Sequence, residues 1–203
     1  MPAIAMNAGH SIRSGRRPAG LPWRRTDGSQ LLEFAMVLPF LVVLAMGAFD
    51  FGAGFLMKQK LTNSAREGAR ISAQLALIDL TRTDCPSTGA AAPCTVDAVR
   101  DAVVAYMQNA NLDTSFIPAN PTQTGPTEWT YSSTADGQAI LVIDRDYIII
   151  DPNGVAMRNS RVVVNYPYTW SFAQIVKLLS ASASFPSSML ISGEALMKNL
   201  ASI

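Results

Sequence analysis

One apolar segment constrains this chain more than any other feature. Residues 31–57 carry only two charges, Glu33 and Asp50, and residues 34–49 form an uncharged stretch of 16 residues. A helix needs about 20 mainly apolar residues to cross a bilayer, and a slightly short core is extended by tilt or by local thinning of the membrane. The segment therefore predicts a membrane-spanning helix over residues 29–57.

The charges around this segment predict its orientation. Residues 1–28 hold a single acid, Asp27, and five arginines, whereas the whole chain has a net charge of only +1; the arginines are Arg13, Arg16, Arg17, Arg24 and Arg25. Lys58 and Lys60 follow the segment. The positive-inside rule then places residues 1–28 in the cytoplasm, as a basic leader, and the body outside. Two alternatives remain open, a buried core helix and a cleavable signal peptide that ends near residues 52–54.

The composition excludes much catalytic chemistry. The chain contains one histidine, His10, and two cysteines, so it cannot assemble a zinc site of the usual type or a convincing Ser-His-Asp triad. Phosphate-binding glycine loops are missing from the sequence, and the near-neutral charge provides no field that attracts nucleic acid. We therefore expect a protein that is not an enzyme, binds no cofactor or metal and has no nucleic-acid partner.

The apolar helix is expected to continue beyond the membrane over residues 58–80. Small or apolar residues recur there at helical spacing, which favours close packing on the protein's own sheet; they are Leu61, Ala65, Gly68, Ala69, Ser72, Ala76 and Leu80. Glu67 and Arg70 have the spacing of an i,i+3 ion pair, and Arg66 lies on the same side as Arg70. We expect the helix to end near residue 79.

Residues 81–203 predict an exported α+β head. Cys85 and Cys94 bracket a loop rich in Pro, Gly, Ser and Thr, and they are disulfide candidates outside the cytoplasm, with two free thiols as the alternative. A helix is predicted over 95–109, with Thr95 as its N-cap and one apolar face, which consists of Val96, Val99, Val103 and Met107.

The second half of the head is expected to form a sheet. Strands are predicted over residues 128–133, 139–143 with an extension or restart at 147–150, 161–168 and 188–198. The strand at 161–168 is expected to end at Pro167, and residues 170–180 predict either a short amphipathic helix or a loop that touches the membrane. The expected fold is a long N-terminal helix packed on a small antiparallel sheet of about four strands.

Two groups of acidic residues have alternative interpretations. Asp144, Asp146 and Asp151 cluster near a strand and a turn, but their spacing lacks the Gly and Glu of a calcium loop, which favours solvated turn residues. Glu33, inside the apolar segment, is either a functional residue or an interfacial one whose carboxylate reaches water. Asp50 is expected to be a solvated residue at the outer membrane edge.

Several motifs along the helix match a known pattern. Gly28 followed by Glu33-Phe34 and an apolar helix containing Pro39 resembles the type IV prepilin processing signal. With the runs FDFG at 49–52 and AREGAR at 65–70, the chain resembles the TadE-like proteins, pseudopilins of the tight-adherence (Flp) pilus machinery. The resemblance covers about residues 26–75, and a TadG-like relative shares part of the pattern.

The resemblance implies a pilin-like fold and a specific processing site. A prepilin peptidase on the cytoplasmic face would cleave between Gly28 and Ser29, next to the Glu33-Phe34 pair. The new Ser29 ammonium would neutralise the Glu33 carboxylate of a neighbouring subunit, because a buried carboxylate is costly unless it is paired. The small pair Ala48 and Gly52 allows close helix contacts in a membrane.

The implied function is that of a minor pilin-like subunit for pilus assembly. Its expected partners are the prepilin peptidase, other pilins and pseudopilins, the inner-membrane assembly platform and membrane lipid. The expected location is the bacterial inner membrane, with a single span and a periplasmic head, and with possible incorporation in the pilus. The alternatives are an uncleaved single-pass scaffold of the secretion platform and an exported adhesion or binding protein.

Overall fold

The computed structural model describes residues 26–75, 77, 80, 92–133, 138–171 and 188–200. The chain divides into two units, Met1–Leu41 and Val42–Ile203, whose boundary falls inside the N-terminal helix. The predictions for the leader, for Cys85 and its loop and for residues 172–180 lie outside the described residues.

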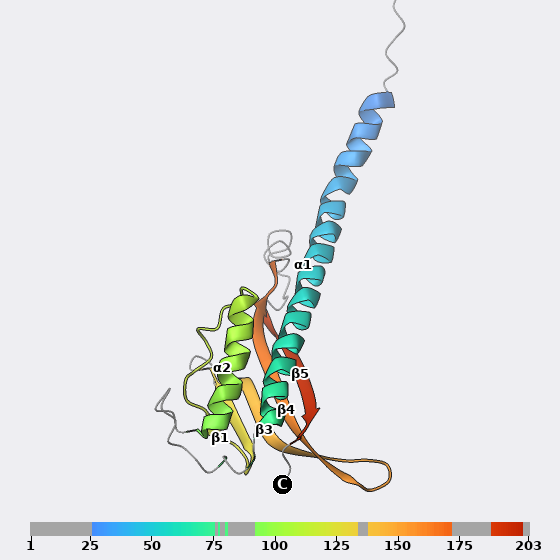
Figure 1. Cartoon of the computed structure of the whole chain (residues 1–203). Helices are drawn as coiled ribbons and strands as arrows, with labels where there is room; N and C mark the ends of the chain where they lie inside the picture. Colours follow the sequence, from blue (N-terminus) through green and yellow to red (C-terminus); the bar gives the residue numbers. More distant parts are fainter. Residues whose placement is uncertain are drawn as a thin grey trace, which may run out of the picture. The chain divides into compact units, whose positions relative to one another are not determined.

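The elements confirm an α+β fold with a long N-terminal helix and an antiparallel sheet (Figure 1). In chain order they are α1 (Thr26–Gln74), α2 (Cys94–Asn109), β1 (Thr122–Gln123), β2 (Glu128–Ser132), β3 (Ala139–Ile150), β4 (Ala156–Thr169) and β5 (Ser188–Lys198). The apolar run of α1, the apolar period of α2 and the β-branched residues of β3 and β4 place these elements over the predicted segments. Strand β4, however, begins at Ala156, five residues before the predicted start.

Helix α1 runs through Pro39 and ends at Gln74, five residues earlier than expected. Its last carbonyls are satisfied by groups from elsewhere in the fold. The Leu200 N–H donates to the Ala73 carbonyl at 3.1 Å, and the Arg145 guanidinium donates to the Leu75 carbonyl at 2.9 Å. Since free carbonyls at a helix end require partners, these two donors stabilise the end of α1.

The sheet is a meander in which each strand pairs with its sequence neighbours, in the order β1-β2-β3-β4-β5. It has five strands rather than about four, because Thr122 and Gln123 pair with Thr130 and Trp129 of β2. This two-residue strand lies in a segment expected to be a loop. The predicted strands at 139–143 and 147–150 form one strand, β3, with an irregularity between Asp144 and Tyr147.

Strand β4 continues past Pro167 to Thr169, so the expected end at the proline is wrong. The register of β3 with β4 extends no further than the pair Leu141 and Val164. Beyond that pair, the strand pairing of the described residues joins β4 to β5 alone, and Pro167 pairs with Leu190. A proline without an N–H donor is tolerated where one side of the strand has no partner.

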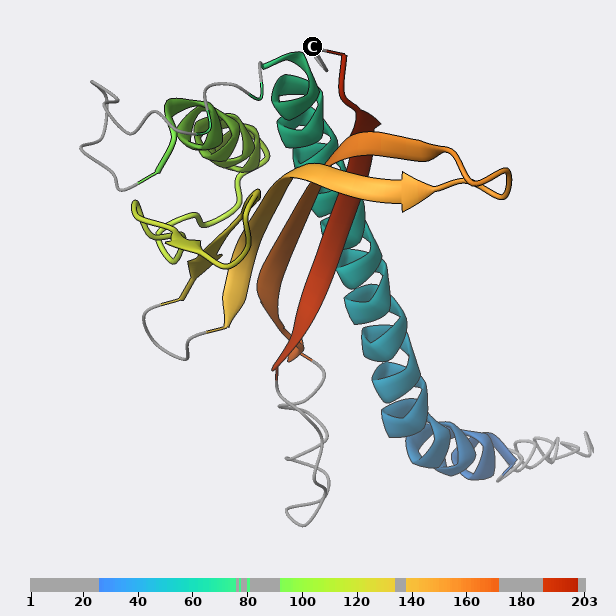
Figure 2. The ribbon, with the colours of Figure 1, turned by 90° about the horizontal axis from the view of Figure 1, so that it is seen from below.

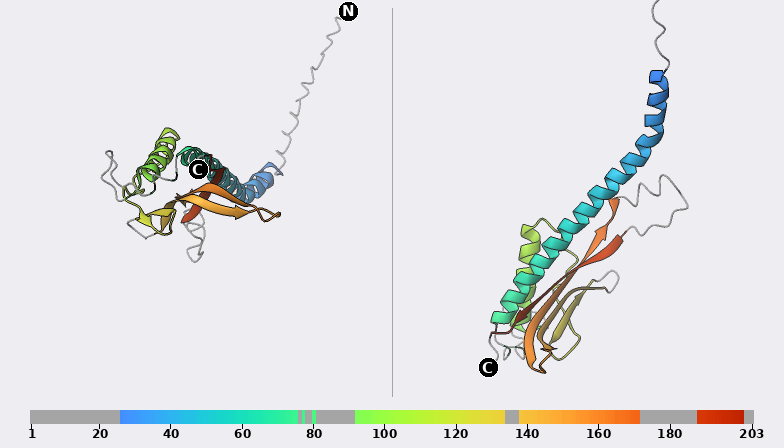
Figure 3. Two further views of the ribbon diagram at one scale, coloured as in Figure 1. Left: turned by 60° about the horizontal axis from the view of Figure 1, so that its bottom comes forward. Right: turned by 90° about the vertical axis from the view of Figure 1, so that its right-hand side faces the viewer.

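Within the second unit, α2 and the later part of α1 cover the same face of the sheet (Figures 2 and 3). The predicted apolar face of α2 is confirmed, since Val96, Val99, Val103 and Met107 are fully buried. They meet residues from the helix-covered face of the sheet and from α1, which are Leu61, Ala65, Ala69, Tyr131, Leu141, Ile143, Val162 and Val164. This cluster is the hydrophobic core of the head.

The start of α2 differs from the prediction. The N-cap is Pro93 rather than Thr95, and the Pro93 carbonyl accepts hydrogen bonds from the N–H groups of Val96 and Asp97 at 2.9 and 3.1 Å. Thr95 is therefore inside the helix, where its side chain is buried. Because a carbonyl that opens the helix is already present two residues earlier, Thr95 has no capping role.

Two glycines set how closely α1 approaches its neighbours. A Cβ on Gly68 would lie 2.6 Å from Cγ2 of Val103, in α2. A Cβ on Gly193 of β5 would lie 2.5 Å from the Leu61 carbonyl carbon and 2.6 Å from the Thr62 nitrogen. The predicted packing of α1 on the sheet is thus confirmed, and it depends on a strand residue without a side chain.

Candidate functional site

The N-terminal part of α1 presents a continuous apolar surface. In the first unit, Leu31, Met36 and Phe40 are 70%, 74% and 65% exposed, and no residue from 28 to 41 is buried. Exposed apolar patches of this extent mark sites that bind another surface or a membrane. The polar side chains along this stretch are too few to form a solvated face.

This surface belongs to a helix that is long and apolar enough to span a membrane. The candidate span lies within Gly28–Gln74, its most apolar 18-residue window has a mean hydropathy of 2.3, and none of that window is buried. A soluble core helix of the same composition would be mostly covered by the fold. The exposure therefore fits a single membrane-spanning helix.

The four residues predicted for processing and assembly lie close together at the start of α1. Gly28, Ser29, Glu33 and Phe34 are all exposed, and a Cβ on Gly28 would meet nothing within 4 Å. Glu33 makes no hydrogen bond or ion pair with any residue that the structure describes. The bond between Gly28 and Ser29 lies in the first turn of α1, where backbone N–H groups lack intrahelical partners.

Asp50 contradicts the expectation of a solvated boundary residue. It is only 8% exposed, and the Tyr168 hydroxyl donates to its Oδ1 at 3.2 Å. Burial, and next the neighbouring Asp50 charge, raise the pKa of Tyr168, so its phenol keeps the proton that it donates. Asp50 thus joins the apolar half of α1 to the end of β4.

A second contact lies one turn further along α1. The Trp170 ring packs over Gly54, where a Cβ would lie 3.4 Å from Cη2 of the indole. Trp170 also makes an edge-to-face contact with Tyr168, with ring centroids 5.0 Å apart. Gly54 therefore leaves room for an aromatic pair that the end of β4 places beside the helix.

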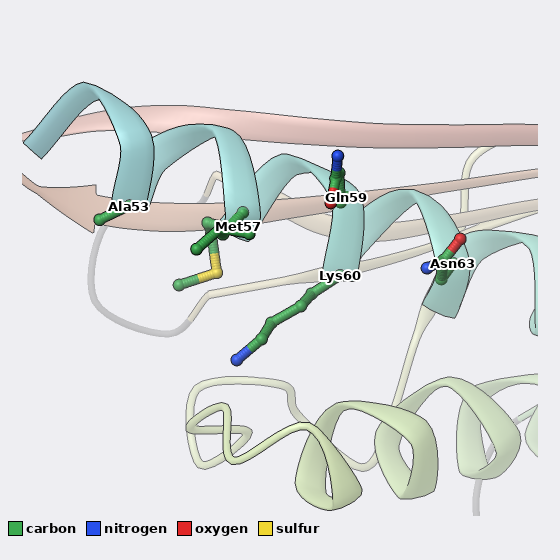
Figure 4. Close-up of a pocket in the computed structure, with 6 residues that line it drawn as sticks. Ala53, Met57, Gln59, Lys60 and Asn63 are labelled. Carbon is green, nitrogen blue, oxygen red and sulfur yellow. The ribbon is translucent and has the colours of Figure 1, made fainter. Parts of the chain in front are cut away.

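Two lysines that follow the apolar segment bind carbonyl groups of the head. Lys58 donates to the Ser192 carbonyl of β5, and Lys60 donates to the Ala110 carbonyl at 2.9 Å. Figure 4 shows Lys60 extending from α1 toward the segment at the end of α2, along a pocket that it lines with Met57 and Asn63. A cation near the carbonyls that end α2 is favourable because of the helix dipole.

The far end of α1 is tied to the sheet by a buried polar cluster. Arg145 is fully buried at the irregularity in β3, and it donates to the Leu75 carbonyl at 2.9 Å. The Asn199 amide donates to the Arg145 carbonyl at 2.9 Å, and Ser160 donates to the Asn199 side-chain oxygen at 2.7 Å. The cluster brings a positive charge to the carbonyl end of a helix whose last turn has no basic residue.

The predicted ion pair on α1 is confirmed. Arg70 donates to both carboxylate oxygens of Glu67, at 2.5 and 3.0 Å, and both side chains are partly exposed. The hydrogen bond from Arg70 lowers the pKa of Glu67 below its ordinary value. Arg66 is exposed as well, so this stretch forms a solvated charged face of α1.

The acidic cluster of the head is engaged in local structure. Asp144 accepts from the Thr127 hydroxyl at 2.9 Å, and Asp146 pairs with Arg158 at 2.9 Å. Asp151 accepts from the Asn153 N–H at 2.6 Å within the turn between β3 and β4, which lowers its pKa. Across the ranges that the structure describes, no group of three acidic, histidine or cysteine side chains is placed to hold a metal.

Two structural partners escaped the sequence analysis. The pairing of Asp50 with Tyr168 joins residues 118 positions apart, and no local pattern signals it. The burial of Arg145 likewise carries no periodic signal. The close approach at Gly193 did have a signal in the sequence, because a lone glycine within a strand pattern indicates a close backbone approach.

Comparison with known proteins gives one family. The family model described as "TadE-like protein" matches residues 28–70, the stretch that holds the apolar surface, Asp50 and the Glu67–Arg70 pair. No curated protein and no solved structure matches the chain.

Proposed function

We propose that this chain is a TadE-like protein, on the strength of the match over residues 28–70, and that it acts in assembling a tight-adherence pilus. One observation carries this proposal. Residues 28–41 of α1 are exposed and mainly apolar, and the same helix continues without interruption into a part that belongs to the core of an α+β head. Such a helix suits a subunit that is held in a membrane at one end and presents a folded domain at the other.

Our more specific proposal is a minor pilin-like subunit that is cleaved after Gly28. Cleavage by a prepilin peptidase would remove all five arginines of the leader and leave Ser29 as the N-terminal residue. Gly28 and Ser29 are exposed, which supports access by a peptidase. Fraying of a terminal turn costs little free energy.

Glu33 is proposed to set the stagger between neighbouring subunits. Its carboxylate is exposed in the isolated chain, but it would be surrounded by apolar helices in an assembly. A Ser29 ammonium from the next subunit would then pair with Glu33 and favour one register over others. The proposed partners are therefore other pilins and pseudopilins, the peptidase and the inner-membrane assembly platform.

The proposed location is the inner membrane, with the N-terminus in the cytoplasm and the head in the periplasm. The arginines that precede the apolar segment support this orientation through the positive-inside rule.

The decisive experiment is intact-mass measurement of the full chain extracted from membranes of cells with and without the prepilin peptidase. We expect the mass of residues 1–28 to be lost only when the peptidase is present. Gly28→Leu should block the loss, whereas Gly52→Leu, a matched change further along the same helix, should not. An unchanged mass in the presence of the peptidase would remove the pilin interpretation.

An uncleaved membrane scaffold is the second candidate, and one observation favours it. The Gly28–Ser29 bond is helical in the structure, so a peptidase must unwind the start of α1 before it can act. The same mass measurement separates the two candidates, because a scaffold keeps its leader under all conditions.

A further inference from the structure

A shallow apolar groove lies where α1 passes the ends of β4 and β5. Its volume is about 320 Å³, and it is lined by Phe51, Gly54, Phe55, Lys58, Trp170, Met189 and Ile191. Lys58 is the one charged residue in this lining. The groove thus combines an apolar trough with a single positive charge at its edge, and the whole lining belongs to the second unit.

The position of the groove along α1 follows from the proposed anchor, on which this inference rests. Twenty residues of helix, from 31 to 50, span about 30 Å, the thickness of the hydrocarbon core. Asp50 would then lie at the edge of that core, and Phe51 and Phe55 would lie in the headgroup layer. The Lys58 backbone would lie about 12 Å beyond the core edge, from where its long side chain can reach back toward the phosphates.

The aromatic residues at this level come from two distant parts of the chain. Phe51 and Phe55 of α1 are 71% and 59% exposed, and Met189 of β5 is 48% exposed beside them. Tyr168 and Trp170 reach the same level from the end of β4 through their contacts with Asp50 and Gly54. Tryptophan and tyrosine are enriched at membrane interfaces because their rings are apolar and their polar groups remain hydrated.

The charge at the edge of the groove matches a lipid headgroup. The Lys58 ammonium has three donors, and the Ser192 carbonyl takes one of them. The remaining donors point to an acceptor with several oxygens, and the phosphate of a phospholipid supplies such an acceptor. An anionic lipid also gains from the positive charge at the membrane surface.

We propose that this groove binds a phospholipid of the surrounding bilayer. One acyl chain lies against Phe51, Phe55 and Trp170, and the lipid phosphate lies at Lys58. The ends of β4 and β5 therefore dock on the membrane surface. The head is held there by a lipid as well as by the helix that enters the bilayer.

Photo-crosslinking from β5 tests the proposal, because β5 is remote in sequence from the anchor. A benzophenone amino acid replaces Met189 in one full-length protein and Met197 in another, each reconstituted in vesicles of equimolar phosphatidylethanolamine and phosphatidylglycerol. Both methionines are partly exposed on the same strand, and they lie about 27 Å apart at 3.4 Å per residue. We expect an adduct of one phospholipid at position 189 and none at position 197.

Filling the groove provides the second variant. Gly54→Leu places a side chain where the Trp170 ring now packs, so it should reduce the lipid adduct at position 189 several-fold. Lys58→Gln should shift the remaining adduct away from phosphatidylglycerol. Both variants should insert into vesicles as the parent protein does, which resistance to alkaline extraction measures.

Three outcomes would overturn the proposal. They are equal lipid adducts at positions 189 and 197, a protein dimer as the adduct at 189, and a lipid adduct that Gly54→Leu leaves unchanged. The failure of the anchor itself is distinguishable, since a chain that alkaline treatment extracts has no membrane span at all. A chain that resists extraction but gives no lipid adduct at 189 removes the groove and leaves the proposed function intact.

Discussion

Gly193 in β5 lies against the backbone of Leu61 in α1, so closely that a Cβ would stand 2.5 Å from the Leu61 carbonyl carbon. The strand and the helix are in direct main-chain contact at this point, and no rotamer change relieves a clash with backbone atoms. The part of α1 around Leu61 is thus fixed to the last strand of the sheet.

Gly193→Ala is therefore expected to destabilise the head by about 1–3 kcal/mol or more, the usual cost of overpacking a core. Gly68→Ala should cost less, because the group it meets is the rotatable side chain of Val103. Gly52→Ala, which meets nothing within 4 Å, is the control and should not destabilise. Urea unfolding of the full chain in detergent, followed by fluorescence, measures all three. A Gly193→Ala protein as stable as the control would contradict the contact.

Arg145→Met should destabilise the head because it removes the donor that satisfies the end of α1. The loss of a hydrogen bond from a charged group costs about 1.5–3 kcal/mol, and the packing change adds to it. Arg158→Met is the control, since Arg158 is 54% exposed and its pair with Asp146 is of the surface kind, worth about 0–1 kcal/mol. Equal unfolding midpoints for the two variants would show that Arg145 has no capping role.

Stability at alkaline pH is expected to depend on Tyr131. Burial, and next the Asp97 charge, raise the pKa of this phenol above its ordinary value of 10.0. The folded state keeps the proton at a pH where the unfolded state loses it, so this contribution is complete below about pH 10 and falls as the pH rises. Tyr131→Phe removes it. Between about pH 8 and about pH 11, the midpoint of urea unfolding should therefore decrease more for the parent protein than for the variant. Equal decreases for the two proteins would contradict the prediction.

Glu33→Ala is expected to leave cleavage and membrane insertion unchanged while it abolishes or strongly reduces piliation. The reason is that the proposed pair with Ser29 forms only between subunits. Met36→Ala is the matched control. It removes an apolar side chain that is 74% exposed and lies nearly one helical turn from Glu33. Counting pili by electron microscopy tests the effect, and normal piliation of the Glu33 variant would remove this residue from the mechanism.

The disulfide between Cys85 and Cys94 remains a prediction, and mass spectrometry tests it directly. The exported protein should be two hydrogens lighter than its reduced form, and alkylation should label it only after reduction. Closing a loop of this length contributes about 2–3 kcal/mol in the chain-entropy model. The variant with serine at both positions should accordingly unfold at lower urea, and labelling of the untreated protein would indicate free thiols instead.

Local patterns in the sequence predicted most elements of this fold. The apolar run of α1, the Val96–Val99–Val103 spacing of α2 and the β-branched strands each carry a period that a short window reveals. Strand β1 carries none, because two residues are too few to alternate. The end of α1 was misplaced because helix-forming residues continue beyond Gln74. The groups that bind the carbonyls at this end, Arg145 and Leu200, are far away in sequence.

The candidate site, like the fold, was predicted from the sequence only where a local motif is present. Gly28, Glu33 and Phe34 were predicted from a local motif, and the structure places them together on one exposed stretch of helix. Asp50 was expected in water because nothing near it in sequence would cover it. Its partner Tyr168 is 118 residues away, and such a contact follows only from the packing of β4 beside α1.

The meander has a consequence for the order in which the head assembles. Each strand pairs only with its sequence neighbours, so β1 to β4 can form as the chain emerges from its N-terminal side. The backbone contact of α1 with the sheet, however, waits for Gly193, which arrives with the final strand. A chain that stops before β5 therefore lacks this backbone contact, although α1 can already pack on α2 and on the earlier strands.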